Sequence, residues 1–316
     1  KPHPVYVRWP HILGIMAFVV FLFQGVTGLF LSFYYQPSPD AAYNSFLVIT
    51  RDTHLGWYIH QMHSWGSHIL IALLLLRLCR FFFHRAYRSP RELVWIVGVL
   101  LALLAIYEAI SGSILPWDQE AYWSFMRTAE AIRELPVFGA IFGFLVGGYD
   151  LGPFLLPRFY VLHIMAVPLA ILALFYLHFA TIRRIGLSRG DGDAGPEYPL
   201  YPDHILNLLT VLVLLFGVIL TAAVVFPSLA TGAADPYVAY EGVLPPWYML
   251  PAHGLIEVLP GDVAGVLMML SFVALTAAPF LDRARGEGSR VVSGSLLVVA
   301  LGLVVWLGYV GYGIRG

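Results

Sequence analysis

Seven long apolar segments constrain the fold of this chain more than any other feature of its sequence. A helix needs about 20 apolar residues to cross a lipid bilayer, and each segment is long enough. They are residues 12–35, 56–83, 93–115, 159–185, 204–226, 263–281 and 291–313. Because backbone groups in a bilayer must bond internally, such segments fold as helices. We therefore expect an all-α membrane protein with seven transmembrane helices.

The composition agrees with a membrane location. Hydrophobic residues make up 59% of the chain and charged residues 12%, outside the range of soluble domains. The single cysteine, Cys79, excludes an internal disulfide and a cysteine metal cluster. We expect no nucleic-acid partner.

Polar segments divide the chain into two parts. Residues 188–203 read as a polar linker between a four-helix part (1–187) that carries the paired histidines and a three-helix part (204–316). A long connection follows the third apolar segment. It contains two short amphipathic pieces, 122–135 and 137–146, which we expect at the membrane surface.

Arginines predict the orientation, because basic residues concentrate in cytoplasmic loops. One side carries Lys1, Arg8, Arg85, Arg88, Arg91, Arg183, Arg184, Arg189, Arg283, Arg285 and Arg290. The other side carries only Arg51, Arg127, Arg133, Arg158 and Arg315. We therefore expect a multi-pass protein of the bacterial inner membrane with a cytoplasmic N-terminus.

Three histidines and one arginine occupy regularly spaced positions on two of these helices. His163 and His178 are fifteen residues apart, and Arg77 follows His63 by fourteen. Each spacing is close to four helical turns, so each pair shares a face and is roughly 21–22 Å apart along the axis. Two helices with histidines at such heights can ligate two stacked haems.

The complete pair, His63 and His163, predicts one haem b with an imidazole on each side of the iron. Such a haem is low-spin and suited to electron transfer. Small residues that could pack beside it are Gly28, Gly66 and Gly112. The alternative is a pair of core histidines that hydrogen-bond between helices, although polar groups inside a bilayer are usually functional.

Several motifs carry a resemblance to a known family. They are QGVTGLFLSFYYQPSPDAA, GWYIHQMHSWGSH, SPRELVWIVGV, SGSILPWDQEAYWS, LPRFYVLHIMAVPLAILALFYLHFATIRRIG and LPPWYMLPAHGLIEVLPG. Across nearly its whole length the chain resembles cytochrome b of respiratory bc complexes and its plastid counterpart. The three-helix end resembles the separate small subunit of the plastid-type enzyme, fused here to the four-helix part.

The resemblance implies a haem-bearing, quinol-oxidising subunit of a multi-subunit complex, with a dimer as one form. Its partners would be an iron–sulfur protein, a c-type cytochrome or both, and its quinol menaquinol or ubiquinol. Residues that match the motifs of this family would have further roles. Trp117, Asp118, Trp247 and Tyr248 would line the quinol pocket. Arg80, and His60 where many relatives have arginine, would meet haem propionates.

The chain departs from the family at the second haem. Arg77 stands where the family has a haem ligand, and an arginine stays protonated and cannot ligate iron. Either His178 is held by a hydrogen bond alone, or it ligates a five-coordinate second haem whose propionate or axial water contacts Arg77. His84 and His11 are the candidates for a replacement ligand.

A second departure lies in the quinol motif. The family has a proton-accepting glutamate where this chain has Pro246. Glu108, one turn before Gly112 inside an apolar helix, is our candidate for the missing proton relay, because an intramembrane carboxylate is functional by default. The alternative is a structural carboxylate that pairs with a polar neighbour or extends to the membrane interface.

We expect a redox subunit that exchanges electrons with a quinol or quinone. A linear route is the simpler design, because a full quinone cycle needs two haems in series. The alternative is a membrane scaffold that keeps one haem and docks partner cytochromes. A transporter is less consistent with the sequence, which has no inverted repeat.

Overall fold

The computed structural model describes residues 3–4, 12–133, 139–140, 143, 152–186, 197–198, 200–238, 240, 242–282 and 287–313. The regular structure in this part of the chain is helical apart from two short strands, β1 (His3–Pro4) and β2 (Glu197–Tyr198), which pair antiparallel. Seven of its helices are long and apolar enough to cross a membrane. The predicted fold class is confirmed.

Contacts divide the chain into two compact units. Unit 1 comprises Lys1–Tyr35, Asn44–Ala109 and Ile164–Leu229. Unit 2 comprises Gln36–Tyr43, Ile110–His163 and Ala230–Gly316. The boundary falls inside three elements, which are α2 (Ala42–Leu47), α4 (Glu92–Ser113) and the turn η3 (Leu162–Ala166).

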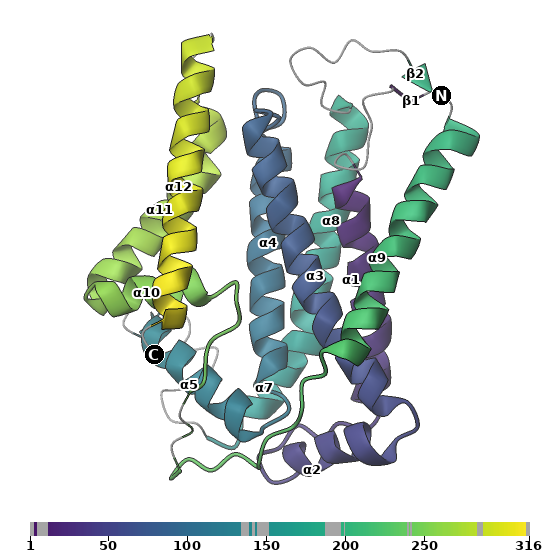
Figure 1. Ribbon diagram of the computed structural model, residues 1–316, viewed down its shortest axis with the longest axis vertical. Helices are drawn as coiled ribbons and strands as arrows, with labels where there is room; N and C mark the ends of the chain where they lie inside the picture. The colour runs from purple at the N-terminus through teal and green to yellow at the C-terminus, as the bar shows by residue number, and fades with distance from the viewer. Residues whose placement is uncertain are drawn as a thin grey trace. The chain divides into compact units, whose positions relative to one another are not determined.

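Unit 1 is built around α3 (Gly56–Phe83). This helix packs against α1 (Leu13–Ser32) and α9 (Ile205–Val225), as Figure 1 shows. The unit also contains α8 (Val167–Ile185) and most of α4, and the short π-helical turns η2 (Val48–Asp52) and η4 (Leu200–His204). Aromatic rings join α1 to α8, since the ring of Phe18 lies 5.2 Å from that of Phe175 and 5.4 Å from that of Phe179.

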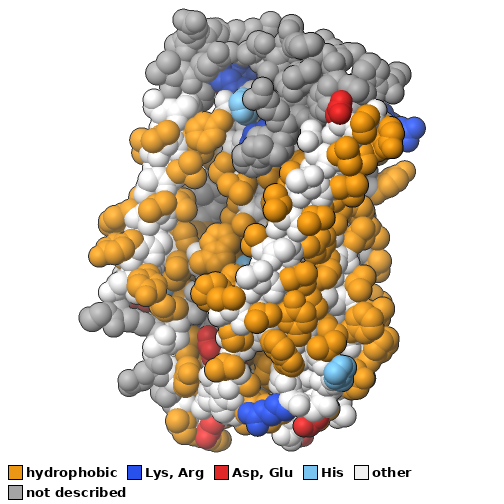
Figure 2. Space-filling view, turned by 45° about the vertical axis from the view of Figure 1, so that its right-hand side comes forward, with side chains coloured by type: hydrophobic (Ala, Val, Ile, Leu, Met, Phe, Trp, Pro, Cys, Tyr) orange, Lys and Arg blue, Asp and Glu red, His pale blue; other side chains and the backbone are white. Residues whose placement is uncertain are grey.

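The outward faces of these helices are apolar. Large hydrophobic side chains that are exposed on α9 include Leu206, Leu209, Val213, Leu214 and Val218. Figure 2 shows hydrophobic side chains covering much of one face. We expect a chain with seven helices that are long and apolar enough to span a membrane to present such a surface to lipid.

Unit 2 contains α5 (Gln119–Arg133), α7 (Leu155–Val161), α10 (Leu250–Val258), α11 (Gly261–Leu281) and α12 (Glu287–Gly313). The short helix α10 packs against both α11 and α12. Two glycines allow α10 and α12 to approach closely. A Cβ on Gly254 would collide with the Leu307 carbonyl, and one on Gly311 would lie 2.5 Å from the Leu250 carbonyl oxygen.

Three details refine the expected elements. The fourth apolar segment is helical from Leu155 to Ile185, so it starts four residues earlier than predicted. The helix α5 covers most of the first predicted surface piece. The second piece (137–146) and the linker (188–203) lie largely outside the described residues.

Candidate functional site

His63, on α3, is oriented by a hydroxyl group of α1. Its Nδ1 lies 2.9 Å from Thr27 Oγ1, and the same hydroxyl donates to the Phe23 carbonyl at 2.9 Å. A hydroxyl has one proton, so His63 Nδ1–H is the donor to Thr27. The other nitrogen, Nε2, then carries the lone pair, which is the tautomer that ligates a metal.

His163 has a matching environment. It lies in η3, where its Nδ1 is 3.1 Å from the Oγ of Ser111, a fully buried residue of α4. The π-helical turn adds one residue to the helix. This addition accounts for the fifteen residues between His163 and His178, where α3 has fourteen between its corresponding positions.

A glycine lies beside each imidazole, directly after the hydroxyl residue. A Cβ on Gly28 would lie 3.1 Å from His63 Cε1, and a Cβ on Gly112 would lie 2.5 Å from His163 Cε1. Both glycines therefore provide room at the ring that any larger residue would remove. The surroundings of both imidazoles fit a haem ligand. Sequence reasoning identified the two glycines but missed Thr27 and Ser111.

Arg77 and His178 lie four helical turns from His63 and His163, at what we call the second height, and they have different contacts. Arg77 Nη2 donates to His178 Nε2 at 2.6 Å, and both side chains are buried, with exposures of 6% and 2%. The guanidinium also lies over the ring of Phe81, 4.4 Å from its centroid. Because Nε2 is occupied by the guanidinium, the arrangement at this height does not fit a second haem held by His178.

The other residues predicted to lie around a haem have distinct positions. A Cβ on Gly66 would run into the side-chain nitrogen of Gln24. The ring of His60 lies edge-on to Phe46, with centroids 4.9 Å apart. Arg80 is in the last turn of α3, and His84 caps that helix as an exposed residue. His11 lies outside the described residues.

Trp117, Asp118 and Gln119 form a junction with the segment that follows α9. Asp118 Oδ1 accepts from the Ala121 amide at 2.9 Å, which caps α5, and its Oδ2 accepts from the Thr231 amide at 3.0 Å. The Gln119 amide donates to the Gly232 carbonyl at 2.8 Å. Trp117 adopts a left-handed backbone conformation (φ 51°), which is strained for a bulky residue and typical of functional sites.

The motif at Pro245–Tyr248 lies just before α10. The Met249 amide donates to the Pro246 carbonyl at 2.7 Å, so the motif is a tight turn. Trp247 is 45% exposed, and its ring meets that of Tyr248 edge-on, with centroids 5.5 Å apart. Burial raises the pKa of the Tyr248 phenol above its usual range, so this group stays protonated.

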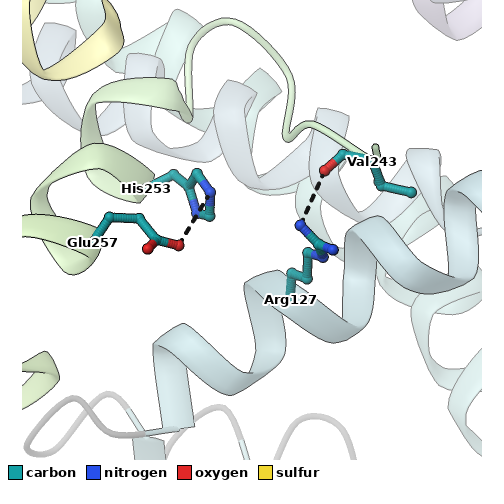
Figure 3. A network of polar contacts seen from close by, with 4 residues as sticks. All are labelled: Arg127, Val243, His253 and Glu257. Atoms are coloured by element: carbon teal, nitrogen blue, oxygen red, sulfur yellow. Dashed lines mark hydrogen bonds and ion pairs between the residues drawn. The ribbon is translucent and has the colours of Figure 1, made fainter. Parts of the chain in front are cut away.

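Polar contacts lie on both sides of this motif in unit 2 (Figure 3). Arg127 Nη1 donates to the Val243 carbonyl at 3.3 Å, which ties α5 to the segment before the motif. On α10, His253 Nε2 lies 3.6 Å from Glu257 Oε1. Glu108 is half-buried on α4 and belongs to unit 1, whereas the predicted quinol residues belong to unit 2.

These features define a helical, multi-pass membrane protein with two half-buried histidines, each of which has its Nδ1 beside a buried hydroxyl group. The family described as Cytochrome b/b6/petB matches residues 1–186, and that described as Cytochrome b(C-terminal)/b6/petD matches residues 233–314. The chain belongs to the cytochrome b family. It is an electron-transfer subunit of a bc-type oxidoreductase complex of the respiratory chain, and its family implies haem b as cofactor.

Individual relatives cover different shares of the chain. Cytochrome b6 of Heliobacterium mobile is 38% identical over 179 residues, which are 56% of this chain and 84% of the relative. Cytochrome b of Schizosaccharomyces japonicus is 30% identical over 290 residues, 89% of this chain and 74% of the relative. A solved structure titled "Hyperthermophilic respiratory Complex III" has a TM-score of 0.85 at 26% identity, covering 98% of this chain and 88% of that one.

Proposed function

We propose that His63 and His163 are the two axial ligands of one haem b, through which this subunit exchanges electrons with a quinol. When bound, a bis-histidine haem supplies a one-electron carrier. The observation that carries the proposal is the repeated local arrangement. Each imidazole has its Nδ1 on a buried hydroxyl, and each lies beside the glycine that follows that hydroxyl. Partners of this kind orient an imidazole towards a metal.

The test is the loss of each imidazole. His63→Ala and His163→Ala should each abolish the low-spin b-type spectrum with its α band, measured on membranes and on the purified full chain. His68→Ala is the matched control, because His68 lies on α3 five residues from His63 and should leave the spectrum unchanged. Retention of the α band in both single variants would rule out the proposed ligands.

The quinol site that we propose includes Trp117, Pro246, Trp247 and Tyr248. Exposed Trp247 and strained Trp117 are supporting observations for a binding role. Asp118 supports the site indirectly, because both of its oxygens accept backbone hydrogen bonds that hold the loop. Pro246 has no titratable group, and we propose Glu108 as the proton relay that replaces the family's glutamate.

We further propose the setting of this reaction. The subunit lies in a bacterial inner membrane with its N-terminus in the cytoplasm. It works with an iron–sulfur protein, a c-type cytochrome or both, in a complex for which a dimer is one form. Menaquinol or ubiquinol is the substrate. The division into parts 1–187 and 204–316, joined by 188–203, stays a prediction.

Electrons could take one of two routes after the quinol is oxidised. A quinone cycle would require a second carrier at the height of His178, and a linear route to a partner haem would not. We propose the linear route, because the residues at that height do not fit a haem. The scaffold function is the second candidate, and the replacement of the family's glutamate by Pro246 favours it.

A further inference from the structure

Three helices of this chain repeat their key residues at an interval of fourteen. Gly14 precedes Gly28 on α1, His63 precedes Arg77 on α3, and Gly98 precedes Gly112 on α4. The members that lie around His63 and His163 are Gly28 and Gly112. The other glycine of each pair, Gly14 or Gly98, therefore lies four helical turns away, at the second height. The sequence alone could have indicated these two glycines through their spacing.

The side chain of Arg77 fills the space beside these two glycines. A Cβ on Gly14 would lie 3.2 Å from Arg77 Nε, and a Cβ on Gly98 would lie 3.0 Å from Arg77 Nη1. At the first height the same two helices present their glycines to imidazole rings. At the second height they present them to a guanidinium.

The guanidinium is stabilised where it lies. It donates to the lone pair of His178 Nε2 and contacts the face of Phe81. No carboxylate pairs with Arg77 among the residues that the structure describes. A buried cation in a bilayer is costly, and a hydrogen bond together with a cation–π contact offsets part of that cost.

We infer that Arg77 replaces the second haem of the family fold, so that this subunit binds one haem and His178 serves as a hydrogen-bond acceptor. Gly14 and Gly98 still leave room for a larger group once the guanidinium is removed. A single substitution, Arg77→His, should therefore restore a second haem site. This inference rests on the proposed haem at His63 and His163.

The experiment counts haems in the full chain purified from membranes in detergent. The pyridine haemochromogen assay should give one haem per chain for the wild type. Arg77→His should give a two-fold increase, together with a second low-spin signal in electron paramagnetic resonance. Leu76→His is the matched control, because Leu76 is the neighbouring residue and is 56% exposed, and it should stay at one haem.

A second variant keeps the inference testable if Arg77→His is poorly made. His178→Ala should leave the single haem and its signal unchanged, because His178 ligates nothing in the wild type. Two haems in the wild type, loss of a haem in His178→Ala, or one haem in a folded Arg77→His chain would each overturn the inference. The signal from the first haem reports folding. Its absence from the wild type would instead refute the proposed function.

Discussion

At the scale of single residues, the hydroxyls of Thr27 and Ser111 decide how the two imidazoles are presented. The histidines themselves were predictable, because paired positions at helical spacing inside an apolar segment have few structural explanations. Their hydroxyl partners were not, because Thr and Ser in membrane helices commonly bond to their own backbone. Thr27 does so as well, donating to Phe23 while it accepts from His63.

The prediction at this scale concerns Glu108. Oxidation of a quinol releases two protons, and Pro246 can accept none. If Glu108 takes over that role, Glu108→Gln keeps the size of the side chain and removes the titrating group. Quinol-dependent haem reduction should then slow at least about tenfold, which corresponds to about 1.4 kcal/mol in the barrier.

The rate should be measured across pH 6–8 with the haem spectrum intact. Glu92→Gln is the matched control, because Glu92 lies in the first turn of the same helix, and it should leave the rate unchanged. An unaltered rate in Glu108→Gln over this pH range would make Glu108 a structural residue and favour the scaffold function.

At the scale of elements, hydropathy predicted the helices well and their irregularities poorly. The fourth apolar segment reads as one uniform helix, but the structure contains η3 at His163. His163 and His178 are fifteen residues apart, whereas His63 and Arg77 are fourteen apart, and this difference was a signal of the turn. A π-helical turn has no strong residue preference, so only the comparison of the two helices could have indicated it.

The prediction at this scale concerns Asp118, which holds the junction between residues 117–119 and the segment that follows α9. Asp118→Ala removes both acceptors and leaves the Ala121 and Thr231 amides unsatisfied. The free energy of unfolding should fall by about 1–3 kcal/mol. Thermal melting in detergent should register this loss, and limited proteolysis should cut faster within 230–249, with the haem spectrum retained.

Glu120→Gln is the control for this variant. Burial and the negative charge of Asp118 raise the pKa of Glu120, so its ionised form is disfavoured in the folded chain. Removing that charge should not reduce stability at neutral pH. An Asp118→Ala chain with wild-type melting and cleavage would contradict the role of Asp118 in holding this loop.

At the scale of the whole molecule, the seven spans followed from segment length and apolarity, because the bilayer imposes both. The two contact units could not be predicted in the same way. Their boundary falls inside α4 and inside η3, since it depends on contacts between residues far apart in the sequence. The linker expected at 188–203 was inferred from the order of residues in the sequence, whereas the units are defined by which residues contact one another.

The central claim is that this subunit moves electrons between a quinol and its haem. The most direct measurement mixes the purified complex with a reduced short-chain quinol under anaerobic conditions and follows the α band of haem b. We predict that the quinol reduces the haem of the wild type and that His63→Ala abolishes the signal. A haem that dithionite reduces fully but the quinol leaves oxidised, at every pH from 6 to 8, would contradict the claim and identify the chain as a scaffold.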